Sequence, residues 1–508
     1  MSRSHPRPRN LGALRASGYR YRTVKEELRE NLQNRLIRGE PWLAGIVGYD
    51  ETVLPQLERA LLSKHDFILL GLRGQAKTRI IRQLVALLDP EIPVVEGAPI
   101  LDDPLHPTTA WARRRIEEMG EATPIRWIDR EERFHEKLAT PDVTIADLIG
   151  DLDPIKAARE RLDFSSEEAI HYGIIPRTNR GIFALNELPD LQPRIQVGLL
   201  NIMEENDIQI RGFPVRIPLD LVLTFTANPE DYTNRGNIIT PLKDRIDSQI
   251  LTHYPRSVDE AIAITHQEAW SERGEAIEVP RFLEEVLEEI AFTARGSDHV
   301  DQSSGVSQRL PIRARELLLS AVERRCLRTP EEPRVPRLCD LASVVPAVTG
   351  RIELVYEGEQ EGPVIVAHRL IGKAMLKVFT RHFPPIYGRR RRRRAEAERA
   401  HGAGSEARER VTPPAYREIL AYFSQGGKIE LADAMSGEAY REELEKVPGL
   451  ATLVERHLGK LAPAEKALAS EWVLESLHEA SLIARQNLDS GVRFSDVLAN
   501  MFQEETER

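Results

Sequence analysis

Short apolar runs alternate with helix-like segments in the first half of the chain. Phe67 to Leu70 is wholly apolar, as is typical of a strand buried on both faces of a parallel sheet. Three more short runs are largely apolar and are also predicted to be strands: Ile92 to Glu96, Ile182 to Leu185 and Leu221 to Thr226. Helical periodicity lies between them, so the pattern predicts one α/β domain over residues 41–252.

Helical periodicity dominates from residue 253 onward. The predicted helices are Ser257 to Ser271, Pro280 to Arg295, Arg313 to Cys326, Arg337 to Thr349, Tyr416 to Phe423, Tyr440 to Leu444, Leu450 to Leu461 and Ala464 to Gln486. Six consecutive arginines, Arg389 to Arg394, interrupt the series, and their mutual repulsion indicates a linker. The predicted domains are therefore 1–40, a basic arm and helix; 41–252, the α/β core; 253–385, a helical region; 386–412, the arginine-rich linker; and 413–508, a C-terminal helical region for partner contact.

Composition bears on whether the protein binds nucleic acid and on the cellular compartment in which it works. The 508 residues are 41% hydrophobic and 30% charged, and the net charge of −10 gives no reason to expect attraction to nucleic acid. Cys326 and Cys339 are spaced as neither a redox pair nor a zinc half-site, so a reducing compartment is expected. The basic N-terminus lacks a following apolar segment, and no run is long enough to span a membrane. We expect a cytoplasmic protein whose first fifteen residues are a mobile tail.

Candidate chemistry lies directly after the first apolar run. Residues 71–78 read G-L-R-G-Q-A-K-T, and a helical pattern follows. In a phosphate-binding loop, glycines let backbone N–H groups turn toward a phosphate, Lys77 reaches the outer phosphates and the Thr78 hydroxyl binds Mg²⁺. Ala76 stands where the general pattern has a second glycine. The residues predicted to contact the nucleotide are Gly71, Gly74, Gln75, Ala76, Lys77, Thr78 and Arg79.

Polar residues also follow the later apolar runs. Asn186 and Glu187 end the third run, where the first residue of such a pair usually holds Mg²⁺ and the glutamate polarises the attacking water. Asn228 follows the fourth run and can orient water against the γ-phosphate. Arg245 lies at a predicted helix end, where it either reaches a neighbouring subunit's nucleotide or is simply solvated.

Seven stretches together resemble the AAA+ ATPases of the magnesium-chelatase I-subunit and MoxR class. They are G-I-V-G-Y-D-E at 45–51, G-L-R-G-Q-A-K-T at 71–78, G-A-P at 97–99 with D-D-P at 102–104, D-L-I-G-D-L-D at 147–153, R-T-N-R-G-I-F-A-L-N-E-L at 177–188, T-A-N-P-E at 226–230 and L-K-D-R-I-D at 242–247. Their order and spacing both fit. The resemblance implies a three-layer core with a parallel sheet, followed by a helical lid at 253–385.

The resemblance also assigns roles to individual residues. Asn228 falls at the sensor-1 position and Arg245 at the arginine-finger position, while Ala76 is common in this class. Arg309 resembles the lid arginine called sensor 2, and Arg313 is the alternative. Asn186 departs from the family, which has an aspartate there, so we expect slow hydrolysis with a high Mg²⁺ requirement.

By this resemblance the protein is an ATP-driven, Mg²⁺-dependent motor. A ring, most commonly a hexamer, is implied, together with a partner that carries a von Willebrand A domain and a substrate that is metallated or remodelled. Two alternatives stay open. One is a transcription regulator that remodels RNA polymerase, although no helix-turn-helix with a basic recognition helix is evident. The other is a nucleotide-gated binding module with little hydrolysis, which Asn186 would permit.

Overall fold

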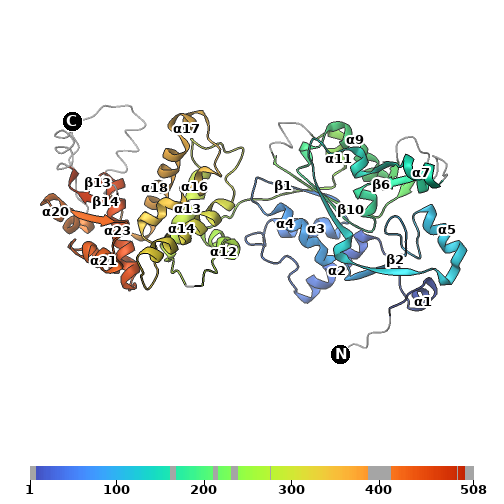
Figure 1. The fold of residues 1–508 in the computed structure, drawn as a ribbon, viewed down its shortest axis with the longest axis horizontal. Coiled ribbons are helices and arrows are strands. Elements are labelled where there is room, and N and C mark those ends of the chain that lie inside the picture. Colours follow the sequence, from blue (N-terminus) through green and yellow to red (C-terminus); the bar gives the residue numbers. More distant parts are fainter. Residues whose placement is uncertain are drawn as a thin grey trace. The chain divides into compact units, whose positions relative to one another are not determined.

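The computed structural model describes residues 7–160, 167–209, 216–229, 238–274, 276–386, 414–488 and 490–497. The chain divides into two compact units, Met1–Tyr254 and Pro255–Arg508 (Figure 1). The division lies two residues beyond the end of the α/β core suggested by the sequence. Each unit has its own hydrophobic core.

A five-stranded parallel sheet forms the centre of unit 1, in the order β11-β1-β10-β7-β4 (Figure 1). These strands are β1 (Phe67–Leu70), β4 (Phe134–Leu138), β7 (Gly181–Asn186), β10 (Leu221–Ala227) and β11 (Ser248–Leu251). The register pairs Leu70 with Ala227 and Phe225 with Leu185. The predicted α/β core with a parallel sheet is confirmed, and the carboxyl ends of β1, β7 and β10 meet at one edge.

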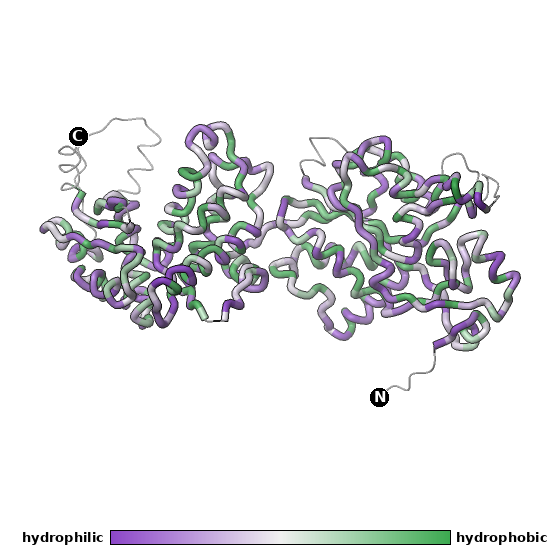
Figure 2. The backbone as a smooth tube through the Cα atoms, viewed as in Figure 1, coloured by the Kyte–Doolittle hydropathy of each residue, from purple (hydrophilic) through white to green (hydrophobic). Residues whose placement is uncertain are grey.

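Alternate residues of the inner strands serve two separate cores. Phe67 and Leu69 pack on one face with α2 (Val24–Arg38), α3 (Val53–Leu62) and α4 (Lys77–Gln83), whereas Ile68 and Leu70 pack on the other with α9 (Pro193–Glu205) and α11 (Thr240–Arg245). A strand that is apolar at every position can bury both faces in this way. Figure 2 shows the hydrophobic (green) positions along these strands. The helices of unit 1 are α1 (Leu11–Ala16), α2 (Val24–Arg38), α3 (Val53–Leu62), α4 (Lys77–Gln83), α5 (Ala110–Met119), α6 (Ile145–Leu148), α7 (Pro154–Glu160), α8 (Ile174–Arg177), α9 (Pro193–Glu205) and α11 (Thr240–Arg245).

The second predicted strand lies outside the central sheet. Residues Glu91–Val95 form β2, which pairs antiparallel with β3 (Ile125–Asp129). The edge position is taken instead by β4, whose residues are only partly buried or exposed. An edge strand lacks the continuous apolar run of an inner strand, so the sequence pattern did not reveal it. Two further antiparallel pairs join β5 (Gly150–Leu152) to β6 (Ile170–Tyr172) and β8 (Asp207–Gln209) to β9 (Arg216–Pro218).

Residues 7–15 of the N-terminal arm belong to unit 1 and include most of α1, which corrects the expectation of a mobile tail for them; residues 1–6 lie outside the described residues. The side chain of Asn10 caps α1 by accepting a hydrogen bond from Ala13 N at 2.9 Å. Leu11 and Leu14 of this helix are fully buried. The arm thus contributes apolar side chains that the charge-rich sequence around them obscured.

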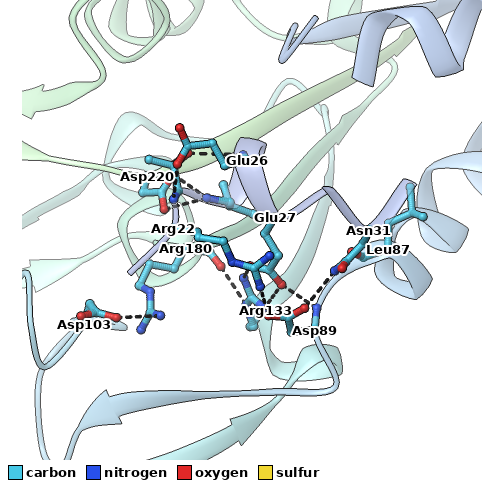
Figure 3. Close-up of polar contacts among 12 residues, drawn as sticks. Arg22, Glu26, Glu27, Asn31, Leu87, Asp89, Asp103, Arg133, Arg180 and Asp220 are labelled. Carbon is cyan, nitrogen blue, oxygen red and sulfur yellow. Dashed lines mark hydrogen bonds and ion pairs between the residues drawn. The ribbon is translucent and has the colours of Figure 1, made fainter. Parts of the chain in front are cut away.

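Buried ion pairs connect α2 and the stretch at 102–104 with the rest of unit 1 (Figure 3). Glu27 of α2 receives two hydrogen bonds from the Arg133 guanidinium, each 2.7 Å long. Asp103 pairs with Arg180 at 2.9 Å, and both side chains are at most 5% exposed. The family-like stretches at 102–104 and 177–188 therefore meet in a structural ion pair.

Unit 2 builds one core from residues on both sides of the arginine-rich stretch. Phe282 stacks on Trp472 with ring centroids 4.8 Å apart, and Phe379 and Phe383 meet the same indole edge-on. The described helices of unit 2 are α12 (Val258–Glu268), α13 (Arg281–Arg295), α14 (Arg309–Arg328), α15 (Leu338–Leu341), α16 (Val345–Thr349), α17 (Tyr356–Glu361), α18 (Pro363–His382), α20 (Arg417–Ser424), α21 (Gly437–Glu445), α22 (Leu450–Leu458) and α23 (Pro463–Glu479). The run Arg389 to Arg394 lies outside the described residues.

The C-terminal region contains a small sheet that helical periodicity did not predict. Strands β12 (Ile429–Ala432), β14 (Gly491–Ser495) and β13 (Ala484–Leu488) pair antiparallel in that order. The predicted helix over Ala464 to Gln486 ends at Glu479, and Ser481 has a positive φ of 58°. A left-handed residue ends helical geometry, so the chain turns into a strand there. Within the described ranges, no helix has the length and apolar character needed to cross a membrane.

Candidate nucleotide site at the carboxyl edge of the sheet

The loop after β1 has the backbone conformation that its glycines predict. Gly74 has φ +75°, a value open to glycine at little cost. A Cβ at Gly71 would lie 1.7 Å from Thr252 Oγ1, so only glycine fits between the loop and the end of β11. Ala76 also has a left-handed φ of 57°. Because alanine is strained in that region, this geometry explains why the general pattern has glycine here.

Lys77 is held inside this loop. Its ammonium group donates to the carbonyl oxygen of Gly71 and, at 3.2 Å, to that of Leu72. The residue is 8% exposed. Both acceptors belong to the loop itself, so the positive charge sits where the backbone turns around a phosphate. Arg79 is exposed on the first turn of α4.

A chain of hydrogen bonds joins α4 to the ends of β7 and β10. Thr78 Oγ1 donates to Asn186 Oδ1 at 3.5 Å, and Thr226 Oγ1 donates to the same oxygen at 3.4 Å. Thr226 Oγ1 also accepts a hydrogen bond from Glu187 N at 3.0 Å. Four residues therefore meet at one point, three of them through their side chains and Glu187 through its backbone amide. The sequence identified three of them and missed Thr226.

Asn228 lies beside the start of the phosphate-binding loop. The carbonyl oxygen of the preceding residue, Ala227, accepts a hydrogen bond from Gly71 N at 3.1 Å. The parallel register of β1 and β10 thus brings Asn228 to the same edge as Lys77. The sensor-1 role of Asn228 stays a prediction.

A second polar cluster anchors the loop from the opposite side and was not predicted. Tyr49 is buried, and its hydroxyl lies 3.0 Å from the carbonyl oxygen of Gln75 and 2.8 Å from that of His253. Burial raises the pKa of Tyr49 to about 12, so the hydroxyl keeps its proton for donation. Gln75 Oε1 accepts from Thr252 Oγ1 at 2.7 Å. The tyrosine in the G-I-V-G-Y-D-E stretch was the available signal for this contact.

Arg245 is engaged within its own chain. It is the last residue of α11, and its guanidinium pairs with Glu204 near the end of α9, with Nε 2.9 Å from Oε2. Nη1 also donates to the carbonyl oxygen of Pro241 at 2.9 Å. The side chain is 28% exposed. Its position at a helix end agrees with the sequence pattern, whereas the partner Glu204 was not foreseen.

The two candidate lid arginines belong to unit 2. Arg309 is the first residue of α14 and is exposed. Arg313, one turn later, pairs with Glu316 at 2.6 Å. That ion pair engages Arg313 on its own helix. Among the described residues the Arg309 guanidinium has no such partner, which favours Arg309 as the arginine able to meet a ligand.

The residues present suit Mg²⁺ held jointly with a nucleotide. The Thr78 hydroxyl and the Asn186 amide oxygen are hard oxygen donors 3.5 Å apart. Mg²⁺ usually takes only one or two protein ligands and completes its shell with water and phosphate oxygens. Within the described part of the chain, no three His, Cys, Asp or Glu side chains are grouped to hold a metal alone. The site thus fits a metal that arrives with its nucleotide.

Comparison with known proteins supports the same assignment. A chain segment of 207 residues is 30% identical to the magnesium-chelatase 38 kDa subunit of Cereibacter sphaeroides, covering 40% of this chain and 56% of that protein. The 38 kDa subunit of Rhodobacter capsulatus is 28% identical over 225 residues, which are 44% of this chain and 58% of the relative. The chain thus spans just over half the length of these curated relatives. No family model matches the sequence.

A solved complex of the magnesium-chelatase subunits BchI and BchD also aligns with the chain. The alignment covers 63% of this chain and 98% of that one, at 18% identity and a TM-score of 0.33. A score this low carries no structural argument. The assignment therefore rests on the curated relatives and on the loop and strand-end geometry. The matched part of the chain is thus similar to the magnesium-chelatase 38 kDa subunits, in agreement with the resemblance to AAA+ ATPases of that class.

Proposed function

We propose that this protein binds ATP with Mg²⁺ and hydrolyses it as the motor subunit of a ring. The observation that carries the proposal is the junction at the carboxyl edge of the sheet. There Thr78, Asn186 and Glu187 are linked through Thr226, next to the buried Lys77. Ligands of open α/β sheets bind at this edge.

Each residue has a distinct role in the proposed reaction. Lys77 exchanges its backbone carbonyl partners for the outer phosphates of ATP. Thr78 and Asn186 hold Mg²⁺, which when bound offsets negative charge on the transferred phosphoryl group. Glu187 orients the attacking water and takes its proton, and Asn228 holds that water in line.

The remaining groups would be completed by assembly. Arg245 would leave Glu204 and contact the nucleotide of the adjacent protomer, and Arg309 would contact the nucleotide of its own chain. Both roles rest on the family resemblance, as does a hexameric ring. An arginine supplied in trans stabilises charge in the transition state, so hydrolysis would depend on assembly.

The proposed partner is a protein with a von Willebrand A domain, and the substrate is one that is metallated or remodelled. Both curated relatives are named as subunits, which supports a protein that works in a larger complex. MoxR-like remodelling and a cytoplasmic location belong to the same proposal. Capture of the tagged protein under ATP, followed by identification of bound chains, tests the partner directly.

Phosphate release tests the enzymatic proposal. The purified protein should release phosphate from ATP in the presence of Mg²⁺, and Lys77→Ala should abolish both that activity and binding of a fluorescent ATP analogue. Arg82→Ala, which removes an exposed cation later on the same helix, should retain the binding. Unchanged affinity of Lys77→Ala would contradict the assignment of the loop.

A nucleotide-gated binding module is the second candidate. Asn186 favours it, because an amide supplies no negative charge to Mg²⁺ where this class has aspartate. Such a protein would bind ATP with normal affinity and release no phosphate in a single-turnover experiment, even when its partner is present.

A further inference from the structure

Glu187 has an unusual backbone conformation. Its φ is 55° and its ψ is 50°, the left-handed region that residues with a side chain rarely adopt. Such conformations persist where the surroundings impose them, and they concentrate at functional sites. Two hydrogen bonds hold the backbone of this residue: Glu187 N donates to Thr226 Oγ1 at 3.0 Å, and the Glu187 carbonyl oxygen accepts from Asp190 N at 3.0 Å.

The same hydroxyl sets the orientation of Asn186. Since Thr226 Oγ1 accepts from Glu187 N, its single proton is available to Asn186 Oδ1 at 3.4 Å. Thr226 is 1% exposed, so water does not readily replace either partner. One buried hydroxyl thus connects the residue of the metal position with the residue of the attacking water.

We propose that Thr226 is the positioning residue for Glu187. It fixes the left-handed turn that aims the Glu187 carboxylate at the nucleotide edge, and it does not itself touch the nucleotide. This inference rests on the proposed ATPase function and adds a residue to it. The expected signature is a loss of turnover without a loss of nucleotide binding.

The strand supplies a matched control. Thr224 lies two residues earlier on β10 and therefore on the same face, and it is fully buried. Its hydroxyl donates to the carbonyl oxygen of Phe183 at 3.3 Å, inside the sheet and away from Glu187. Thr224→Val and Thr226→Val remove the same group from similar surroundings, so shared effects on folding cancel in the comparison.

The experiment compares Thr226→Val, Thr226→Ser and Thr224→Val in the full-length protein. Three quantities are measured: single-turnover phosphate release, the Kd of a fluorescent ATP analogue, and deuterium uptake at the Glu187 amide. Thr226→Val should lower turnover at least tenfold, keep the Kd within twofold and speed amide exchange. Thr226→Ser retains the hydroxyl, so its turnover, Kd and amide exchange should all match those of the wild type. Thr224→Val should also resemble the wild type.

Two results would overturn the inference. One is a Thr226→Val protein with unchanged turnover and unchanged exchange at Glu187. The other is an equal loss in both valine variants, which would indicate a general effect on β10. If the wild type releases no phosphate, the ATPase proposal fails, yet the exchange measurement still reports whether Thr226 holds the Glu187 amide.

Discussion

Glu27 and Arg133 form a two-pronged ion pair inside unit 1, with both nitrogen–oxygen distances at 2.7 Å. Their side chains are 5% and 1% exposed. Arg133 Nε also donates to the carbonyl oxygen of Arg180 at 2.8 Å. The pair joins α2 to the residues that lead into β4, so it ties the N-terminal helix to the edge of the central sheet (Figure 3).

Breaking this pair should destabilise unit 1 strongly. Glu27→Gln leaves a buried guanidinium without its counter-charge, and we expect the free energy of unfolding to fall by about 3–5 kcal/mol. Glu136→Gln is the control, because it breaks an ion pair with Arg82, whose side chain is 60% exposed, and should cost less than about 1 kcal/mol. Urea unfolding followed by tryptophan fluorescence measures both. Equal decreases in the free energy of unfolding for Glu27→Gln and Glu136→Gln would show that burial of the Glu27–Arg133 pair does not add to stability.

Asn186→Asp should lower the Mg²⁺ requirement for hydrolysis. The hydroxyls of Thr78 and Thr226 already donate to Asn186 Oδ1, so a carboxylate there keeps both hydrogen bonds and adds charge beside the metal. The Mg²⁺ concentration at half-maximal activity should fall several-fold, with turnover equal or faster. Asn186→Ala, which lacks the oxygen, should shift that concentration upward. Identical Mg²⁺ titrations for all three proteins would place the metal elsewhere.

Arg245 and Glu187 should complement each other between protomers. Arg245→Ala should retain ATP binding and lose hydrolysis, as should Glu187→Gln. A mixture of the two should recover partial activity, because an Arg245→Ala site retains Glu187 and receives Arg245 from its neighbour. Mixing Glu187→Gln with Lys77→Ala is the control, since it creates no complete site. Activity that stays absent from the first mixture would argue against action in trans.

Glu288 should make the stability of unit 2 depend on pH. Burial raises the pKa of this carboxyl to about 7, although Gln308, Arg295 and Arg315 act in the opposite direction. The folded state therefore holds the proton more tightly than the unfolded state, where the pKa is near 4.5. The free energy of unfolding should decrease as pH rises from about 4.5 to 7 and level off above that range.

Glu288→Gln should remove this decrease. Each pKa unit corresponds to about 1.4 kcal/mol, so the lost pH dependence can reach about 3 kcal/mol. Gln308 Nε2 donates to Glu288 Oε2 at 2.9 Å, and a glutamine oxygen can accept the same hydrogen bond. Urea unfolding at pH 5 and pH 8 compares the two proteins. If the free energy of unfolding changes equally between pH 5 and pH 8 in the wild type and in Glu288→Gln, then Glu288 is not the source of the pH dependence.

The sequence predicted the inner strands because each is a short, largely apolar run of residues. β1, β7 and β10 are buried on both faces, and their runs of residues could be recognised without any knowledge of neighbours. β4 and β11 lie at the edges of the sheet, where partly exposed residues break the apolar pattern. Long-range pairing, not local pattern, creates these strands.

The candidate site likewise contains residues that local sequence reveals and residues that only long-range contacts reveal. Lys77, Thr78 and Glu187 were predicted because spacing along the chain places each at a strand end. Thr226 was missed because its function depends on the register of β10 against β7, which brings two distant residues together. Glu204 was missed for the same reason, since only the packing of α9 against α11 gives Arg245 this partner.

The single core of unit 2 limits where this protein can be divided. The curated relatives match fewer than half of the residues of this chain, so an experimenter could choose to express a fragment that ends before the arginine run. Such a fragment would lose Trp472, the indole on which Phe282 stacks and against which Phe379 and Phe383 pack. Three aromatic rings would then meet water, so the shortened chain would aggregate. A shortened form that stays folded must therefore keep the helices that follow residue 413.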